Sequence, residues 1–194
     1  MLDVETLGTN ANSPILSIGA VSSTGETFYR NLDVQKQLDG GATVDWSTVL
    51  WWMEQSEDAR KSIPAQGDNV NEALRAFVEA FDWDNSEVWC NGASFDFPIL
   101  EAAFRREGIR HPWTYNRLRD FRTLYKLYAD VVPRANPKVA HNALSDAEAQ
   151  MATLMEILNE HKTRNLIQMQ YRKEAAQGFI PDEKQQSICG GHCG

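Results

Sequence analysis

Four carboxylates and one imidazole stand in three short acidic motifs of this 194-residue chain. The first motif holds Asp3 and Glu5, the second ends in Asp96, and the third runs from His141 to Asp146. Carboxylate oxygens are hard ligands that suit cations such as Mg²⁺ and Mn²⁺. If the fold brings these side chains together, they make a site for two such cations with a base beside it. Two such cations and a base are the groups that hydrolysis of a phosphodiester bond by water requires.

The spacing of the first two motifs supports this interpretation only in part. Asp3 and Glu5 are two residues apart, so on a strand they project to the same face. Asp96 follows an apolar strand-like run and stands at the start of a helix, where the dipole favours an anion. A surface strand and a helix cap would explain the same residues, so each motif alone is a weak signal.

The third motif carries more information. Ser145 and Glu148 have the spacing of a capping box, which predicts Asp146 in the first turn of a helix. His141 then lies on the loop before that helix, within possible reach of the other acids. A lone loop histidine usually has no special role, and this one is notable because of the acidic helix start that follows it.

The rest of the chain predicts a mixed sheet with helices around it. Two apolar, β-branched runs separated by a turn at Gly25 indicate a hairpin. Later runs alternate between helical and strand-like periodicity, which is typical of an α/β fold. We expect strands at 15–22, 26–32, 87–90 and 115–119, and helices at 44–63, 69–81, from about 98 to 107, through 124–128, and after 145. One domain is expected over 1–178, with a flexible tail at 179–194.

Charge and composition exclude fewer classes of function than the motifs do. The formal net charge of −8 is unusual for a nucleic-acid partner, but the stretch 105–138 has nine basic and three acidic residues. Metal ligands explain part of the acidity, so we weigh the total charge as neutral evidence. No transmembrane segment or signal peptide is visible, so we expect no membrane association and a cytoplasmic location.

The three cysteines fit a reducing compartment better than a disulfide framework. Cys90 is expected to be a small core residue. Cys189, His192 and Cys193 could hold zinc with a fourth ligand from elsewhere, but a tail with no role in the fold is the simpler interpretation.

The three motifs, in this order, resemble the DnaQ-like 3′–5′ exonucleases of the DEDDh type. Longer phrases resemble one branch, the RNase T-like exonucleases of phages and bacteria. The histidine subtype fits, because the tyrosine subtype would carry Tyr where Asn142 stands. The phrases that carry the resemblance, over about Met1 to His161, are Asp3–Thr9, Trp51–Ser56, Asn91–Asp96, Arg119–Leu124 and His141–Asp146.

The resemblance implies an RNase H-like fold and hydrolysis that releases nucleoside 5′-monophosphates from single-stranded DNA or RNA 3′ ends. It implies two Mg²⁺ or Mn²⁺ ions held by Asp3, Glu5, Asp96 and Asp146, with His141 as general base and a possible homodimer. Of Trp51 and Trp52, we expect one in the core and one stacked on a base; Arg119 and Arg122 are candidates for phosphate contact. The residues expected to contact nucleic acid are Thr6, Leu7, Gly8, Trp51, Asn91 and Phe95.

Three further possibilities stay open at this point. A non-catalytic nucleic-acid-binding module could keep the same fold, although loss of activity normally removes at least one ligand. An endonuclease of the same superfamily would not need His141. Asp3 has only two residues before it, whereas a typical strand has about 5–6, and we hypothesise that the natural protein begins upstream of Met1.

Overall fold

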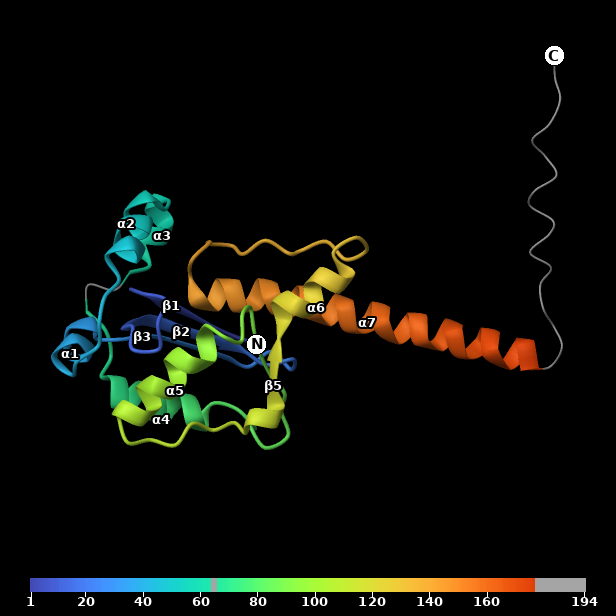
Figure 1. Cartoon of the computed structure of the whole chain (residues 1–194), viewed down its shortest axis with the longest axis horizontal. Coiled ribbons are helices and arrows are strands. Elements are labelled where there is room, and N and C mark those ends of the chain that lie inside the picture. The colour runs from blue at the N-terminus through green and yellow to red at the C-terminus, as the bar shows by residue number, and fades with distance from the viewer. Residues whose placement is uncertain (64–65, 177–194) are drawn as a thin grey trace, which may run out of the picture. The chain divides into compact units, whose positions relative to one another are not determined.

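The computed structural model describes residues 1–63 and 66–176. A compact unit, Met1–Ile157, contains every strand that the structure describes (Figure 1), and a second unit begins at Leu158. The described residues of the second unit continue helix α7 (Ala143–Ala176). The expected tail, with Cys189, His192 and Cys193, lies outside the described residues.

The strands of the first unit form two sheets, one antiparallel and one parallel. Strands β1 (Leu2–Thr6), β2 (Ile15–Val21) and β3 (Thr27–Asn31) form an antiparallel sheet in that order. β4 (Val88–Cys90) pairs in parallel with β5 (Leu118–Asp120), and β4 is in contact with β1. The predicted hairpin and the predicted α/β class are confirmed. The expected strand at 115–119 is wrong at its start, because Tyr115–Arg117 form a 3-10 turn in which Tyr115 is 89% exposed.

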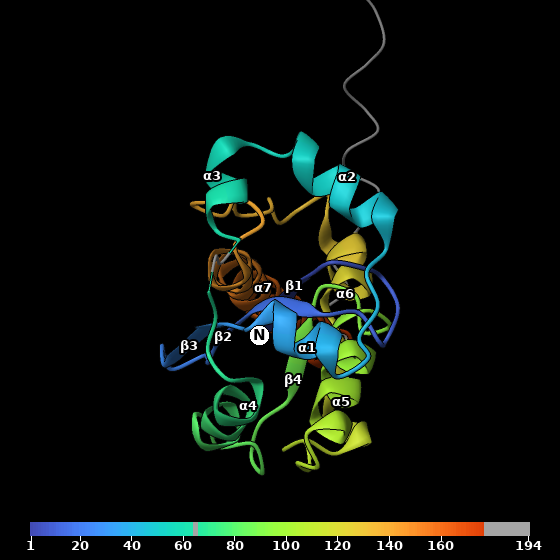
Figure 2. The same ribbon diagram turned by 90° about the vertical axis from the view of Figure 1, so that its left-hand side faces the viewer.

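Helices lie on both sides of these strands (Figure 2). All seven residues of β2 are buried, as expected for a central strand packed on two sides. The main core joins one sheet face to α4 (Val70–Glu79) and α5 (Asp96–Arg106), through residues such as Phe77 and Phe104. A smaller core lies around α6 (Phe121–Tyr128) and α7, with Phe121 and Ile157 fully buried.

Three more helices complete the described part of the unit. They are α1 (Val34–Asp39), α2 (Trp46–Glu54) and α3 (Glu57–Lys61). The single helix expected at 44–63 is therefore wrong. Gln55 is extended, and the Ser56 hydroxyl accepts a hydrogen bond from the Ala59 amide at 3.2 Å, so a new helix begins there.

Gly19 sets the distance between the sheet and α7. It stands in β2 opposite Asp3, and a Cβ added to it would lie 2.2 Å from the backbone of Ala143 and Leu144. Only glycine allows two backbones to approach so closely. The first turn of α7 therefore lies directly on the middle of the sheet.

From Leu158 to Lys173 the side chains of α7 are nearly all exposed, including Leu166, Ile167 and Tyr171. Within residues 1–63 and 66–176, no helix combines the length and apolar character needed to cross a membrane.

Candidate active site

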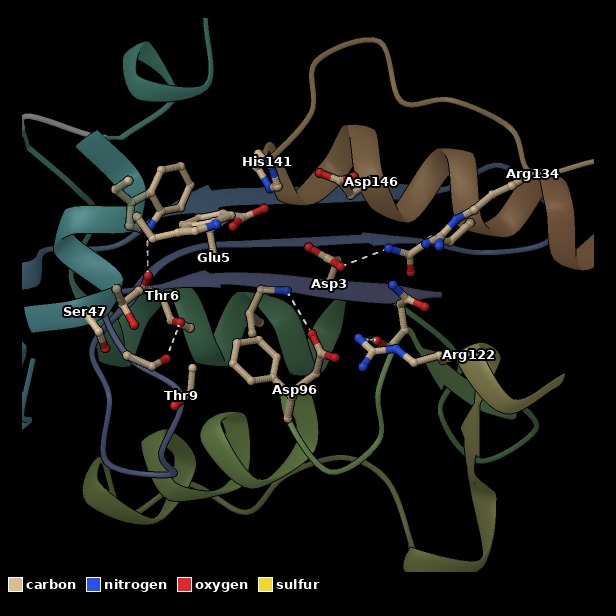
Figure 3. A pocket seen from close by; sticks show the side chains of 18 residues that line it. Asp3, Glu5, Thr6, Thr9, Ser47, Asp96, Arg122, Arg134, His141 and Asp146 are labelled. Atoms are coloured by element: carbon tan, nitrogen blue, oxygen red, sulfur yellow. Dashed lines mark hydrogen bonds between the residues drawn. The ribbon is translucent and has the colours of Figure 1, made fainter. Parts of the chain in front are cut away.

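The five residues expected to do chemistry line one pocket of about 600 Å³ (Figure 3). They come from three elements and one loop that are far apart in the sequence. The residues are Asp3 and Glu5 of β1, Asp96 of α5, His141 before α7 and Asp146 in its first turn.

The pleat of β1 explains how two acids reach the same space. Leu2, Val4 and Thr6 are buried, while Asp3 and Glu5 alternate with them and are half-buried. The alternation sends both acids to the opposite face from the main core. Carboxylate oxygens of Asp3, Glu5 and Asp146 lie within 4.8 Å of one another.

Asp96 reaches the pocket from the start of α5. It is 2% exposed, and its Oδ1 accepts a hydrogen bond from the Val4 amide at 3.2 Å. The thiol of Cys90, which is buried as expected, forms a second hydrogen bond to it. Asp96 is thus tied to the strand that carries Asp3 and Glu5, although its oxygens lie outside the group of three above.

Helix α7 begins three residues earlier than the sequence pattern predicts. Asn142, not Ser145, caps it: the Asn142 Oδ1 accepts from the Ser145 amide at 3.1 Å. The Ser145 hydroxyl instead accepts from the Val139 amide at 3.0 Å and fastens the preceding loop. Asp146 still lies in the first turn, and its carboxylate accepts from the Asn142 amide at 3.1 Å.

His141 is held in a backbone conformation that non-glycine residues rarely adopt, with φ at 61°. The Ser62 hydroxyl donates to its carbonyl oxygen at 3.1 Å. Its ring stands 4.7 Å from that of Trp51 and 6.0 Å from that of Trp52, measured between centroids. Strained backbone of this kind is common at functional sites, where the surroundings fix a side chain in place.

The electrostatics of the pocket favour a cation. Burial first, and then the charges of Asp96 and Glu5, raise the pKa of Asp3 well above its usual range. Burial and the neighbouring acids raise the pKa of Glu5 to about 8, and burial raises the pKa of Asp96 to about 7. Burial also raises the pKa of Asp146. Since the donors are hard oxygens and a cation would relieve their repulsion, the residue set fits a divalent metal.

Five of the six residues expected to contact nucleic acid line the pocket; these are Thr6, Gly8, Trp51, Asn91 and Phe95. Leu7 is not among the lining residues, because its side chain packs against the cluster of Leu16, Trp52 and Ala59.

The structure also distinguishes the members of two pairs. Trp52 is the core member, 3% exposed with its ring N–H donating to the Thr6 carbonyl, whereas Trp51 is 39% exposed. Arg122 lines the pocket, whereas Arg119 is not among the lining residues and pairs with Glu87 at 2.7 Å.

Sequence reasoning missed Gln150 and Arg134, which also line the pocket. Gln150 is 4% exposed, and its Nε2 donates to Asp3 Oδ1 at 3.0 Å. Its position four residues after Asp146 places both on one face of α7, and that spacing was the available signal. Arg134 stands in a proline-marked loop, and no pattern in the sequence singles it out.

Comparison with known proteins agrees with this geometry. Residues 1–158 match the family described as the 3′–5′ exoribonuclease Rv2179c-like domain. The chain belongs to that family. It is also 29% identical over 119 residues to an exodeoxyribonuclease of Enterobacteria phage T4, and the match covers 52% of each chain. The chain therefore spans about half the length of this curated relative. The predicted relation to 3′–5′ exonucleases is confirmed at the level of the family.

Proposed function

We propose that this protein is a metal-dependent 3′–5′ exonuclease of the DEDDh type, in the RNase T-like branch. Its substrates would be single-stranded 3′ ends, and its products nucleoside 5′-monophosphates. The observation that carries the proposal is the convergence of four acids and His141 in one pocket of a chain from a 3′–5′ exoribonuclease family. The DEDDh chemistry requires all five of these residues.

The four acids would hold two Mg²⁺ or Mn²⁺ ions, which supply Lewis-acid activation of water and neutralise charge on the phosphoryl group. The ligands would be Asp3, Glu5, Asp96 and Asp146. His141 would accept the proton of the attacking water, and its left-handed backbone and the Ser62 hydrogen bond hold it in position. Gln150 would orient the Asp3 carboxylate through its amide.

The end of the pocket that is lined by Thr6, Gly8 and Trp51 would receive the terminal nucleoside. The backbone at Thr6 and Gly8 lies beside Trp51, which is open to the pocket. Stacking of a base on an aromatic ring contributes about 1–3 kcal/mol and tolerates any base. This arrangement would let the enzyme remove successive nucleotides with little sequence preference.

Labelled oligonucleotides test the proposal directly. A 3′-labelled single strand incubated with Mg²⁺ should release labelled mononucleotide at once, while a 5′-labelled strand should shorten stepwise. Early internal fragments would indicate an endonuclease, and an intact but bound strand would indicate a binding module. Either result would reject the proposed activity.

The sugar of the substrate needs its own comparison. The matched family is described as exoribonucleases, whereas the phage relative is named an exodeoxyribonuclease. Parallel degradation of DNA and RNA strands of one sequence, with duplexes as controls, assigns the preferred sugar. Faster loss of duplex than of single strand would contradict the proposed single-strand preference.

A further inference from the structure

Two arginines stand at the end of the pocket away from Thr6, Thr9 and Ser47 (Figure 3). Arg122 comes from α6 and Arg134 from the loop that leads to α7. Asp3 and Asp96 lie between the two ends. The pocket is therefore polarised, with an aromatic and hydroxyl-lined end, an acidic middle and a basic end.

Neither guanidinium contacts an acid as an ion pair, although the charge of Arg122 acts on Asp96 and that of Arg134 acts on Asp146. Among residues 1–63 and 66–176, no carboxylate oxygen lies within 4.0 Å of Arg122 or Arg134, although the chain carries a net charge of −8. Arg119 makes the contrast clear, because its charge is paired with Glu87. Two cations in one pocket, without a carboxylate in contact with either, point to an anionic ligand.

Other contacts hold both side chains in place. Arg122 Nη2 donates to the Asn91 carbonyl at 2.8 Å and lies against Gly92, where an added Cβ would come within 3.3 Å of it. Arg134 lies over the rings of Phe121 and Tyr125, 5.8 and 5.7 Å from their centroids. These contacts use one donor and the flat faces, and leave the remaining N–H groups for a ligand.

We propose that Arg122 and Arg134 bind the phosphate of the second linkage from the 3′ end of the substrate. The inference rests on the proposed function, which puts the terminal nucleoside at the Thr6 end and the scissile phosphate at the acids. The strand must then leave toward the basic end. Without these cations, the carboxylates of the pocket would repel that next phosphate.

A neutral linkage tests the inference. Two oligonucleotides are compared, one natural and one with an uncharged methylphosphonate at the second linkage from the 3′ end. The wild-type enzyme should remove the last nucleotide from the modified strand roughly 10–100-fold more slowly in kcat/KM, as expected for losing charge-assisted hydrogen bonds. Equal rates on the two strands would overturn the inference.

Variants assign the effect to the arginines. In Arg122→Gln combined with Arg134→Gln, the natural strand should slow and the ratio of the two rates should fall close to one. Arg119→Gln, which changes an arginine already paired with Glu87, should keep the wild-type ratio. Arg134→Lys keeps the positive charge but removes the planar guanidinium that lies over Phe121 and Tyr125. This variant therefore separates the effect of the charge from the effect of the packing. An unchanged ratio in the double variant would overturn the assignment.

Binding separates this inference from the proposed activity. Fluorescence anisotropy with the Asp96→Asn protein needs no turnover and should show weaker binding of the methylphosphonate strand. Discrimination in binding without any cleavage by the wild type would reject the exonuclease and keep the phosphate site. Cleavage without discrimination in either assay would keep the exonuclease and reject the phosphate site.

Discussion

Asp96 illustrates what the sequence shows about single residues and what it leaves out. Its residue type and its place at the start of a helix can be predicted from the sequence, and so can the same-face spacing of Asp3 and Glu5. The Val4 amide and the Cys90 thiol that hold Asp96 are contacts between distant segments, which no local pattern encodes. The candidate acids were thus predictable, whereas their supporting contacts were not.

Replacing Asp96 by Asn should abolish turnover while the fold survives. The amide can still accept from Val4, but it cannot anchor cations. Removing a buried acid whose pKa is raised should also make the metal-free protein more stable near pH 8. Activity assays with Mg²⁺ and thermal unfolding in EDTA measure both effects. The exposed Asp39→Asn variant serves as control, and an active Asp96→Asn enzyme would show that the site is wrong.

Replacing His141 by Ala should slow hydrolysis by roughly 10²–10⁴-fold, the usual contribution of a general base. Substrate binding should change much less, because the acids and arginines stay in place. Single-turnover rates on a 3′-labelled strand provide the measurement. His111→Ala, at a histidine stacked on Trp113 outside the pocket lining, is the matched control. Rates equal to those of the wild type would remove His141 from the mechanism.

Local competition between signals explains the errors at the level of elements. The pattern predicts Ser145 as the cap of α7, whereas Asn142 caps the helix and its first turn packs on β2 at Gly19, a contact between distant segments. The helix expected at 44–63 is divided in two because Ser56 is better suited to the N-cap of a new helix than to the interior of a longer one. Strong hydrophobic periodicity, as in α4, gave the correct helix with Asn69 as its cap.

Gly19→Ala should separate α7 from the sheet. The new methyl group would meet the backbone of Ala143 and Leu144, which cannot move aside as a side chain would. We expect a loss of about 3 kcal/mol or more in the free energy of unfolding, and activity should fall further because Asp146 and His141 move with the helix. Chemical denaturation and activity at matched folded fraction test this. Gly40→Ala, where an added Cβ would lie 3.3 and 3.4 Å from the carbonyl oxygens of Lys36 and Gln37, should cost much less.

The free energy of unfolding of the whole molecule should depend on pH through its buried acids. Because the folded pKa values of Glu5 and Asp96, about 8 and about 7, lie above their ordinary ones, the folded state binds more protons than the unfolded state between roughly pH 4 and 8. Their stabilising effect is complete at low pH and is lost as pH rises through those values. The Met1 ammonium acts oppositely, since burial lowers its pKa to about 5.

In EDTA, the melting temperature of the wild type should therefore fall between pH 5 and pH 8 relative to that of Glu5→Gln. One kcal/mol corresponds to about 2–4 °C for a chain of this size, so calorimetry can resolve the difference. Added Mg²⁺ should stabilise the wild type more at pH 8 than at pH 5, because cation and proton compete for the same oxygens. Parallel curves for the two proteins would contradict the electrostatic account.

The contact between Trp51 and His141 gives the protein an optical signal of its own. The Trp51 ring lies 4.7 Å from that of His141 and is part of the pocket lining. The difference in fluorescence between the wild type and Trp51→Phe should therefore isolate the emission of an indole at the site. A base stacked on Trp51 should shift that spectrum, so one chromophore would report the occupancy of the pocket.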